Sequence, residues 1–228
     1  MSKPDFSEQI VSFYAQLDLK LPKSLGVEVL NPFKDARVIE LSRWYHKKYY
    51  HQKKKRYFLF GINPGRHGSG ITGIPFTDPM QINEMGFQND WPQRHELSAV
   101  FIQDMIQAYG GISAFAEQFY VSSVCPLGFI KGGKNINYYD EAALMKKTER
   151  FIIKSIKQQI ALGCRTDLTF CIGQGKNYKV LTKLNEQYKL FEKIIPLPHP
   201  RWVMQYRLKR KTEFVNEYIS KLSENPID

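Results

Sequence analysis

Residues 57–65 read YFLFGINPG, a run of apolar and aromatic side chains that ends in a turn. Such a run closed by Gly, Asn and Pro is typical of a short buried strand. Further strands of this kind are predicted at residues 119–124, 167–172 and 193–197. Strands that are apolar on both faces belong to parallel sheets covered on both sides, so the pattern indicates an α/β protein.

Helical periodicity fills most of the segments between the predicted strands. Helices are expected at 5–17, 35–50, 98–109, 111–117 and 140–162, then from about 176 to 187, and finally as a basic helix at 203–222. Residues 65–95 are expected to form a long loop rich in Gly and Pro. This alternation predicts a three-layer α/β/α sandwich with a central, mostly parallel four-stranded sheet. No repeat or linker interrupts it, so residues 1–228 are expected to form a single domain.

The composition excludes several classes of protein. With 43% hydrophobic and 24% charged residues, the chain has the make-up of a globular domain and not of a disordered one. No segment approaches the roughly 20 apolar residues that span a bilayer, and the N-terminal residues lack the pattern of an export signal. We therefore expect a monomer without a membrane partner, located in the cytoplasm or, in a bacterium, associated with the nucleoid.

The cysteines indicate neither a disulfide framework nor a metal site. Cys125, Cys164 and Cys171 are odd in number and far apart, and they form no C-x-x-C pair with nearby histidines. We expect three reduced, mostly buried thiols. No metal and no cofactor is expected.

The net charge of +11 and the isoelectric point near 9.4 favour a polyanionic partner. Charge alone does not establish nucleic-acid binding, because many basic proteins bind none. The basic residues gather at 47–48, 53–56, 131–134 and 207–211. Several of these clusters flank the candidate site described next, which strengthens the prediction of a nucleic-acid partner.

Polar residues follow three of the four predicted strands. Asn63, Ser123 and His199 come at or just after the strand ends, and the carboxyl ends of parallel strands form one ligand-binding edge. Each residue taken singly also fits a structural role: Asn63 in a turn, Ser123 bonded to backbone, His199 held between prolines. Their predicted convergence is what favours a functional site.

The loop after Asn63 has a distinctive form. It runs from Gly61 to Gly68 and then through Thr72-Gly73-Ile74-Pro75-Phe76. Glycines let a backbone approach a ligand closely, and prolines restrict the path of the chain. Phe76 at the end of such a loop could stack on a flat ring, although packing in the core is an alternative for this side chain.

This stretch resembles the first motif of the uracil-DNA glycosylase superfamily, and specifically of its single-strand-selective monofunctional branch. That branch carries Gly-Met-Asn-Pro-Gly, a short spacer, and Thr-Gly-Val-Pro-Phe, and the spacing from Asn63 to Phe76 matches without a gap. The resemblance continues at Cys125-Pro126-Leu127 and at His199-Pro200, in the same order. It covers most of the chain from about residue 30 to 220.

The resemblance implies a role for each matching residue. Asn63 would position the attacking water, and Phe76 would stack on a base flipped out of DNA. The backbone N–H groups of Ile62 and Gly65 would hydrogen-bond that base, and His199 would lie against its O2 atom. The activity implied is excision of a damaged base, with DNA as the partner.

The chemistry of these residue types agrees with that activity. A base must leave the duplex before its sugar carbon can be attacked. Cleavage of the glycosidic bond leaves negative charge on the base, which a donor such as His199 stabilises in the transition state. Asn63 cannot accept a proton as a carboxylate does, but it can orient water. Since no lysine nucleophile is needed, the expected product is an abasic site in an unbroken strand.

Two departures from the branch bear on specificity. Ser123 stands where the branch has an asparagine that reads the edge of uracil, which suggests a roomier pocket that admits other deaminated bases such as xanthine. The segment after His199-Pro200 also differs, so the wedge that enters the helix must be built differently. Its candidate residues, and the basic residues expected to meet phosphates, are Arg201, Trp202, Met204 and Gln205, then Arg207, Lys209, Arg210 and Lys211.

Other functions were weighed against this one. A zinc-dependent nucleobase deaminase requires H-x-E and P-C-x-x-C, and the chain has neither. A DNA-binding protein without catalytic activity would share the charge and the aromatic residues. An enzyme of the same fold that acts on free nucleosides or RNA also remains compatible with the sequence.

Overall fold

The computed structural model describes residues 5–224. At its centre lies a four-stranded parallel sheet in the order β3-β2-β6-β7. The strands are β2 (Tyr57–Gly61), β3 (Phe119–Ser123), β6 (Leu168–Ile172) and β7 (Lys193–Leu197). The predicted α/β fold and the predicted parallel sheet are therefore confirmed.

Side chains of β2 alternate between two hydrophobic cores. Phe58 and Phe60 belong to one buried cluster, and Tyr57 and Leu59 belong to the other. Because successive side chains of a strand point to opposite faces, this division shows that the sheet is covered on both sides. Pro196 lies in β7, at the edge of the sheet, where the lost backbone donor does not break an internal ladder.

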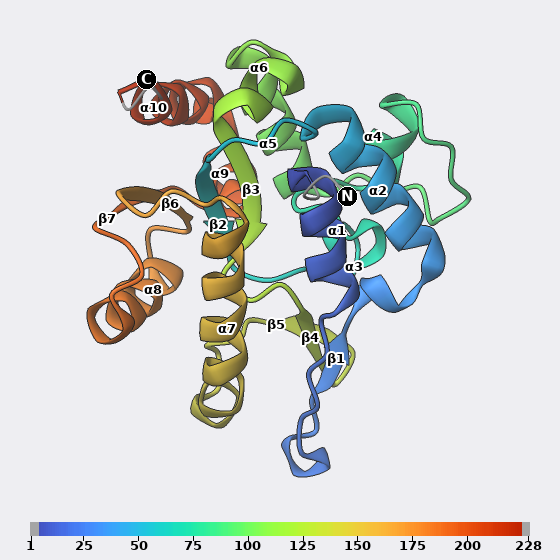
Figure 1. The fold of residues 1–228 in the computed structure, drawn as a ribbon, viewed down its shortest axis with the longest axis vertical. Helices are drawn as coiled ribbons and strands as arrows, with labels where there is room; N and C mark the ends of the chain where they lie inside the picture. The colour runs from blue at the N-terminus through green and yellow to red at the C-terminus, as the bar shows by residue number, and fades with distance from the viewer. Residues whose placement is uncertain (1–4, 225–228) are drawn as a thin grey trace.

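Helices cover both faces of the sheet, as Figure 1 shows. One face packs against α1 (Phe6–Ala15), α2 (Ala36–Tyr49), α7 (Ala142–Leu162) and α8 (Lys176–Tyr188). The other packs against α5 (Leu97–Ala108), α6 (Gly111–Gln118), α9 (Pro200–Tyr206) and α10 (Lys211–Ser223). Short 3-10 turns occur at Lys23–Leu25, Pro32–Lys34 and Leu208–Arg210.

A second, antiparallel sheet was not foreseen from the sequence. It contains β1 (Glu28–Leu30), β4 (Gly128–Lys131) and β5 (Lys134–Ile136), in the order β1-β4-β5. A Gly-Gly pair joins β4 to β5, and two-residue Gly turns are a known hairpin signal. The strands are only three or four residues long, too short for their alternation to stand out.

Two predicted segments need correction. The expected loop at 65–95 contains two short helices, α3 (Ser69–Thr72) and α4 (Pro79–Glu84). The basic helix expected at 203–222 is broken, because α9 ends at Tyr206 and α10 begins at Lys211. Residues 205–210 are all exposed, so no buried side chain holds this stretch in a continuous helix against the sheet.

The three cysteines are free and buried, as expected. Burial raises the pKa of the Cys125 and Cys171 thiols to about 12. Within residues 5–224, none of the helices has both the length and the apolar character needed to cross a membrane.

Candidate active site

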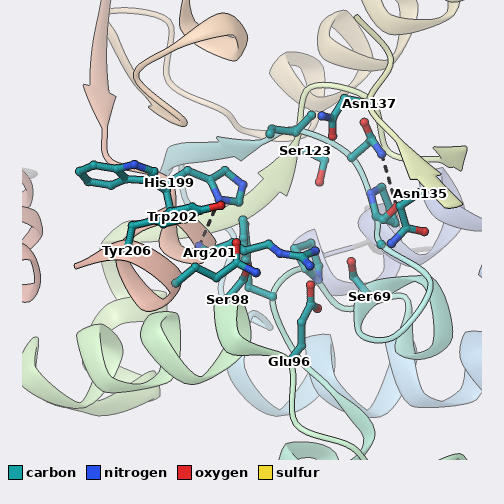
Figure 2. Close-up of a pocket in the computed structure, with 17 residues that line it drawn as sticks. Ser69, Glu96, Ser98, Ser123, Asn135, Asn137, His199, Arg201, Trp202 and Tyr206 are labelled. Carbon is teal, nitrogen blue, oxygen red and sulfur yellow. Dashed lines mark hydrogen bonds between the residues drawn. The ribbon is translucent and has the colours of Figure 1, made fainter. Parts of the chain in front are cut away.

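The carboxyl ends of the central strands open into one cavity of about 370 Å³, called here the base cavity (Figure 2). Volumes of this order are typical of sites for small ligands. Asn63 follows β2, Ser123 ends β3 and His199 follows β7, and the structure places all three on the cavity wall. Its other lining residues are Ile62, Pro64, Gly65, Ser69, Pro75, Phe76, Glu96, Ser98, Asn135, Asn137, Arg201, Trp202, Gln205 and Tyr206.

Asn63 is held by the segment that follows β5. Its Oδ1 accepts a hydrogen bond of 3.1 Å from the main-chain N–H of Tyr138, and its Nδ2 lies 3.4 Å from the Ile136 carbonyl. A main-chain N–H can only donate, so the oxygen of the amide is identified by this contact. A carbonyl oxygen has two lone pairs, which leaves Oδ1 able to accept a further hydrogen bond, for example from water.

His199 is the N-cap residue of α9, and its Nδ1 accepts a hydrogen bond from the Arg201 main-chain N–H at 3.2 Å. In a neutral imidazole the other nitrogen, Nε2, then carries the proton and is a donor. Burial, assisted by the positive charge of Arg201, lowers the pKa of His199 to about 4. At neutral pH this side chain is therefore an uncharged donor on the cavity wall.

Phe76 lies against the main chain at the start of the first motif. A Cβ atom on Gly61 would be 2.8 Å from the Phe76 ring, so the ring requires a glycine there. Phe76 itself has a φ of 51°, a left-handed conformation that costs a residue with a side chain about 1 kcal/mol. Its ring centroid is 6.4 Å from that of His199, so an aromatic face and an imidazole line the same cavity.

Glu96 is a cavity residue that sequence reasoning missed. Its carboxylate fills the space beside Gly68, which has no side chain. Burial raises the pKa of Glu96, while nearby Arg201 opposes that shift. Figure 2 shows Glu96 and Ser123 on opposite sides of the cavity. No spacing rule links Glu96 to the strand ends, and only its position just before α5 could have drawn attention to it.

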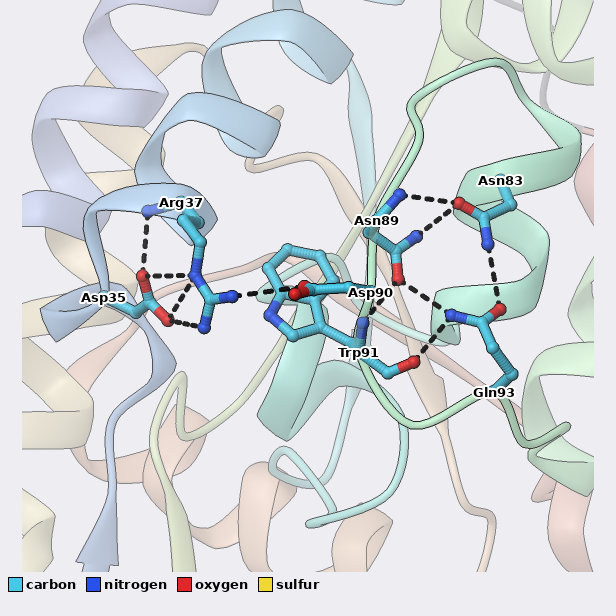
Figure 3. A network of polar contacts seen from close by, with 7 residues as sticks. All are labelled: Asp35, Arg37, Asn83, Asn89, Asp90, Trp91 and Gln93. Carbon is cyan, nitrogen blue, oxygen red and sulfur yellow. Dashed lines mark hydrogen bonds and ion pairs between the residues drawn. The ribbon is translucent and has the colours of Figure 1, made fainter.

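Polar contacts fix the loop that carries Glu96. Asp78, whose side chain is fully buried, caps α4 and also accepts a 2.9 Å hydrogen bond from the Glu96 main-chain N–H. Farther out, Asn83, Asn89 and Gln93 bond to one another, as Figure 3 shows. In the same figure Arg37 pairs with Asp35 and Asp90. The loop is thus bonded along most of its length, and Glu96 has a defined place.

Comparison with known proteins assigns the chain to a family. Residues 48–223 match the model of the uracil DNA glycosylase superfamily. The chain belongs to this superfamily. No curated protein sequence matches it. The crystal structure of wild-type SMUG2 from Pedobacter heparinus is 43% identical in sequence, with a TM-score of 0.91, over 97% of this chain and 98% of that one.

Membership of the superfamily confirms the resemblance expected from the first motif. It makes this protein a DNA glycosylase of repair, a hydrolase that acts on DNA. Among residues 5–224, no group of three or more His, Cys, Asp and Glu side chains is placed to hold a metal ion.

The glycosylase brings only part of the predicted DNA-binding segment to the cavity. Arg201, Trp202 and Gln205 line it, and Trp202 is 37% exposed. Met204 instead packs against the core between the sheet and α10, so its side chain is not at the cavity. The Arg207 guanidinium lies over the Trp202 ring, 5.1 Å from its centroid.

The remaining basic residues of that segment lie farther along the glycosylase chain. Lys209 is exposed in the turn between α9 and α10. Arg210 pairs with Glu213 at 2.8 Å, and Lys211 pairs with Asp104 at 2.8 Å. Both cations thus have carboxylate partners within the protein, and their contact with phosphates stays a prediction.

Two arginines near the first motif, Arg66 and Arg94, were also missed, and they lie close to the predicted Arg201. Arg66, Arg94 and Arg201 are close enough to His67 that their charges, together with burial, lower the pKa of His67. Arg94 and Arg201 line a smaller cavity of about 220 Å³ that shares Glu96 with the base cavity. Arg66 belongs to the motif itself, so its proximity to the site could have been read from the sequence.

Proposed function

We propose that this glycosylase is monofunctional and hydrolyses the N-glycosidic bond of uracil in DNA, leaving an abasic site. The observation that carries the proposal is the shared wall of the base cavity: an amide, an aromatic ring and an uncharged imidazole donor surround one space at the carboxyl edge of the sheet. Those groups match the charge changes that glycosidic cleavage requires.

The proposed reaction begins with a nucleotide flipped out of DNA into the base cavity. Phe76 stacks on the base, and the backbone N–H groups of Ile62 and Gly65 hydrogen-bond it. Asn63 orients a water molecule whose oxygen bonds to the sugar carbon. The carbon–nitrogen bond breaks with its electron pair on the base, and His199 Nε2–H stabilises the resulting negative charge. The departing base finally takes up the proton that the water releases.

His199 suits this role because it is uncharged. Its pKa of about 4 leaves the imidazole neutral at physiological pH, with the proton placed on Nε2 by the α9 cap. A neutral donor carries no net positive charge, so it does not stabilise every nearby anion to the same extent. It stabilises the negative charge that develops on the base oxygen as the glycosidic bond breaks. Because this charge is larger in the transition state than in the ground state, the transition state is stabilised more.

The exposed basic and aromatic residues beside the cavity form the proposed DNA-binding face. Arg201, Trp202 and Gln205 are the proposed wedge residues, since they lie at the cavity and are exposed. Arg207 and Lys209 are proposed to meet phosphates, where each contact would add to the salt dependence of binding. We propose that the protein acts as a monomer.

Ser123 is proposed to widen the range of bases. Its side chain is shorter than that of asparagine, and no other residue in 5–224 makes a hydrogen bond to its hydroxyl. A serine therefore reads fewer edge atoms of the base than an asparagine would. Xanthine and other deaminated bases are the proposed additional substrates.

Incubation with uracil-containing oligonucleotides, followed by heating in alkali, tests the proposal. Alkali breaks the strand only where a base is missing, so strand breaks in the wild type report excision. Asn63→Ala should lower the excision rate at least about 100-fold, because water is no longer oriented. Breaks without the alkali step would contradict the monofunctional assignment.

The same experiment separates the alternatives that the sequence left open. Tight binding to the oligonucleotide without strand breaks would favour a DNA-binding protein that lacks activity. Release of the base from nucleosides or RNA, but not from DNA, would favour the third assignment. The superfamily match makes excision from DNA the expected outcome.

A further inference from the structure

Two buried residues, Tyr138 and Asn177, contact the surroundings of the base cavity but do not line it. Tyr138 is 0% exposed and Asn177 is 1% exposed. The Tyr138 hydroxyl donates a hydrogen bond of 2.9 Å to Asn177 Oδ1. Tyr138 follows β5 of the small sheet, whereas Asn177 is in the first turn of α8. The contact therefore joins two parts of the chain that secondary structure alone does not connect.

Tyr138 holds Asn63 from one side. The Tyr138 main-chain N–H donates to Asn63 Oδ1 at 3.1 Å, two residues after the Ile136 carbonyl that faces the amide nitrogen. Both ends of the Asn63 amide thus depend on where residues 136–138 lie. Ile136 is the last residue of β5 and pairs with Phe129, but Asn137 and Tyr138 lie beyond the strand, so the small sheet alone does not fix Tyr138.

Asn177 holds the neighbourhood of His199 from the other side. Its Nδ2 donates to the Ile172 carbonyl at 3.1 Å, at the end of β6. The next residue, Gly173, has a φ of 113° and donates its N–H to the Leu197 carbonyl at 2.8 Å. A Cβ atom on Gly173 would lie 3.6 Å from His199 Cδ2, so the turn packs directly on the imidazole.

We propose that Tyr138 and Asn177 are positioning residues that fix Asn63 and His199 relative to each other across the base cavity. This inference rests on the proposed function, in which Asn63 is the amide that orients water and His199 is the donor that stabilises charge on the base. They come from β2 and β7, and β6 lies between those strands. The Tyr138–Asn177 hydrogen bond links the loops beyond the strand ends, where the sheet no longer sets the spacing.

Such a link matters because catalytic geometry tolerates little error. Productive sites hold their groups within about 0.5 Å, and their supporting hydrogen bonds set that precision. The Tyr138 hydroxyl also stays protonated and able to donate, because burial raises its pKa. With Asn177 Oδ1 as its acceptor, the bond has one direction only, because the amide nitrogen already donates to Ile172.

Tyr138→Phe tests the inference most directly, because it removes the hydroxyl and keeps the main-chain N–H that bonds Asn63. We expect the single-turnover rate of uracil excision to fall about tenfold, through misplacement of Asn63 and His199. KM and the affinity for an oligonucleotide with a stable abasic-site analogue should not change. Tyr14→Phe is the matched control: Tyr14 is 2% exposed, its hydroxyl lies 3.0 Å from that of Tyr120 in the core, and it does not line the base cavity.

A double variant separates positioning from stability. Tyr138→Phe combined with Asn177→Leu removes both partners of this hydrogen bond, so no unpaired hydroxyl remains at residue 138 and the fold should be more stable than with Asn177→Leu alone; in both variants the Ile172 carbonyl loses the Asn177 donor. Excision by the double variant should remain at least about tenfold slower than wild type if positioning is the role. In an Asn63→Ala background, Tyr138→Phe should have little further effect, because the residue it positions is gone.

The outcomes are distinguishable from failure of the proposed function. If the wild type excises uracil and Tyr138→Phe matches it in rate, the positioning role is wrong and the glycosylase activity stands. A rate loss no larger than that of Tyr14→Phe at equal loss of stability would also contradict the role. If the wild type releases no base from DNA, the proposed function itself has failed.

Discussion

Among the polar clusters in residues 5–224 of this glycosylase, two differ clearly in where their hydrogen bonds go. The first joins α1, α2 and β3, and every polar group in it is bonded within the protein. His46 lies 2.6 Å from the Ser42 carbonyl through Nδ1 and 2.9 Å from the Tyr120 hydroxyl through Nε2. The Tyr120 hydroxyl is in turn 3.0 Å from that of Tyr14. We call this group the tyrosine–histidine cluster.

The second cluster is the wall of the base cavity, where polar groups face an open space. No other residue within 5–224 makes a hydrogen bond to His199 Nε2, the Ser123 hydroxyl or the Glu96 carboxylate. These groups open onto the cavity, where water can bond to them until a ligand takes its place. The difference teaches that the tyrosine–histidine cluster serves the fold, whereas the cavity wall has kept its hydrogen-bonding capacity for a ligand.

The largest expected effect separates the two functions of His199, which is both a helix cap and a donor. Asn caps helices well, so His199→Asn should keep α9 and the free energy of unfolding close to wild type. It removes the imidazole donor, and loss of one such donor lowers the excision rate about 100-fold. Quench-flow or gel kinetics, with circular dichroism for stability, measure both. An active variant would show that the cavity wall does not need this donor.

The opposite result is expected in the tyrosine–histidine cluster. His46→Leu removes one of the two partners of the Tyr120 hydroxyl, the other being the Tyr14 hydroxyl, and the loss of one buried hydrogen bond costs about 1 kcal/mol. Denaturant unfolding should show that loss of stability. The excision rate per folded molecule should stay at the wild-type value, since His46 does not line the base cavity. A loss of rate without a loss of stability would show that the tyrosine–histidine cluster also contributes to excision.

Both clusters contain a buried histidine, and protonation of these histidines in acid should lower the stability of the fold. Burial lowers the pKa of His46 and of His199 to about 4. A histidine has a pKa near 6.5 when unfolded, so between these values the unfolded chain binds more protons and stability falls as pH falls. His46→Leu should reduce that slope by up to about 1.4 kcal/mol per pH unit.

Excision should not follow a histidine titration near neutrality. Since His199 is already neutral there, the single-turnover rate should stay level from pH 8 down to about 5 and fall only near pH 4. A descending limb centred near 6.5 would mean that the charge of His199 changes where the structure keeps it constant. Such a result would mean that water solvates His199 more fully than the structure indicates.

A smaller effect concerns cations outside both clusters. Arg207→Gln should lower the slope of binding affinity against salt concentration by about 1, as expected for one lost phosphate contact. Lys211 already pairs with Asp104, so Lys211→Gln should change that slope less. Binding to oligonucleotides over a range of salt concentrations gives both slopes. Equal slopes would show that the ion pair with Asp104 opens when DNA binds.

The smallest expected effect is on specificity. Ser123→Asn restores a side chain with both a donor and an acceptor at the edge of the base cavity. Excision of uracil should change only a few-fold, while excision of xanthine should fall relative to it, because added contacts favour one base edge. A panel of oligonucleotides with different deaminated bases measures the ratio. An unchanged ratio would remove Ser123 from the account of substrate range.

The central sheet and the three strand-end residues could be predicted from the sequence because local signals carry them. The apolar run at 57–60 fixes a buried strand, and the turn after it fixes where Asn63 lies. The corresponding signals before Ser123 and His199 are as compact. Parallel pairing then brings the strand ends together, as the base cavity shows.

What could not be predicted depends on contacts between distant segments. Glu96 comes to the cavity because Asp78, 18 residues earlier, holds its main chain. The break between α9 and α10 falls where residues 205–210 are all exposed, which the helical pattern of the sequence does not reveal. Asn135 and Asn137 line the cavity from β5 and the residue just beyond it, in a sheet too small to leave a clear pattern.

The buried thiols offer a practical opportunity for following base flipping in real time. Cys125, Cys164 and Cys171 are all shielded from solvent, and burial raises the pKa of each, so little thiolate is present to react with a maleimide dye. A Leu208→Cys variant, at a position that is 58% exposed, would then be labelled selectively without removal of any native cysteine. A fluorophore there would report the approach of DNA to the α9–α10 turn.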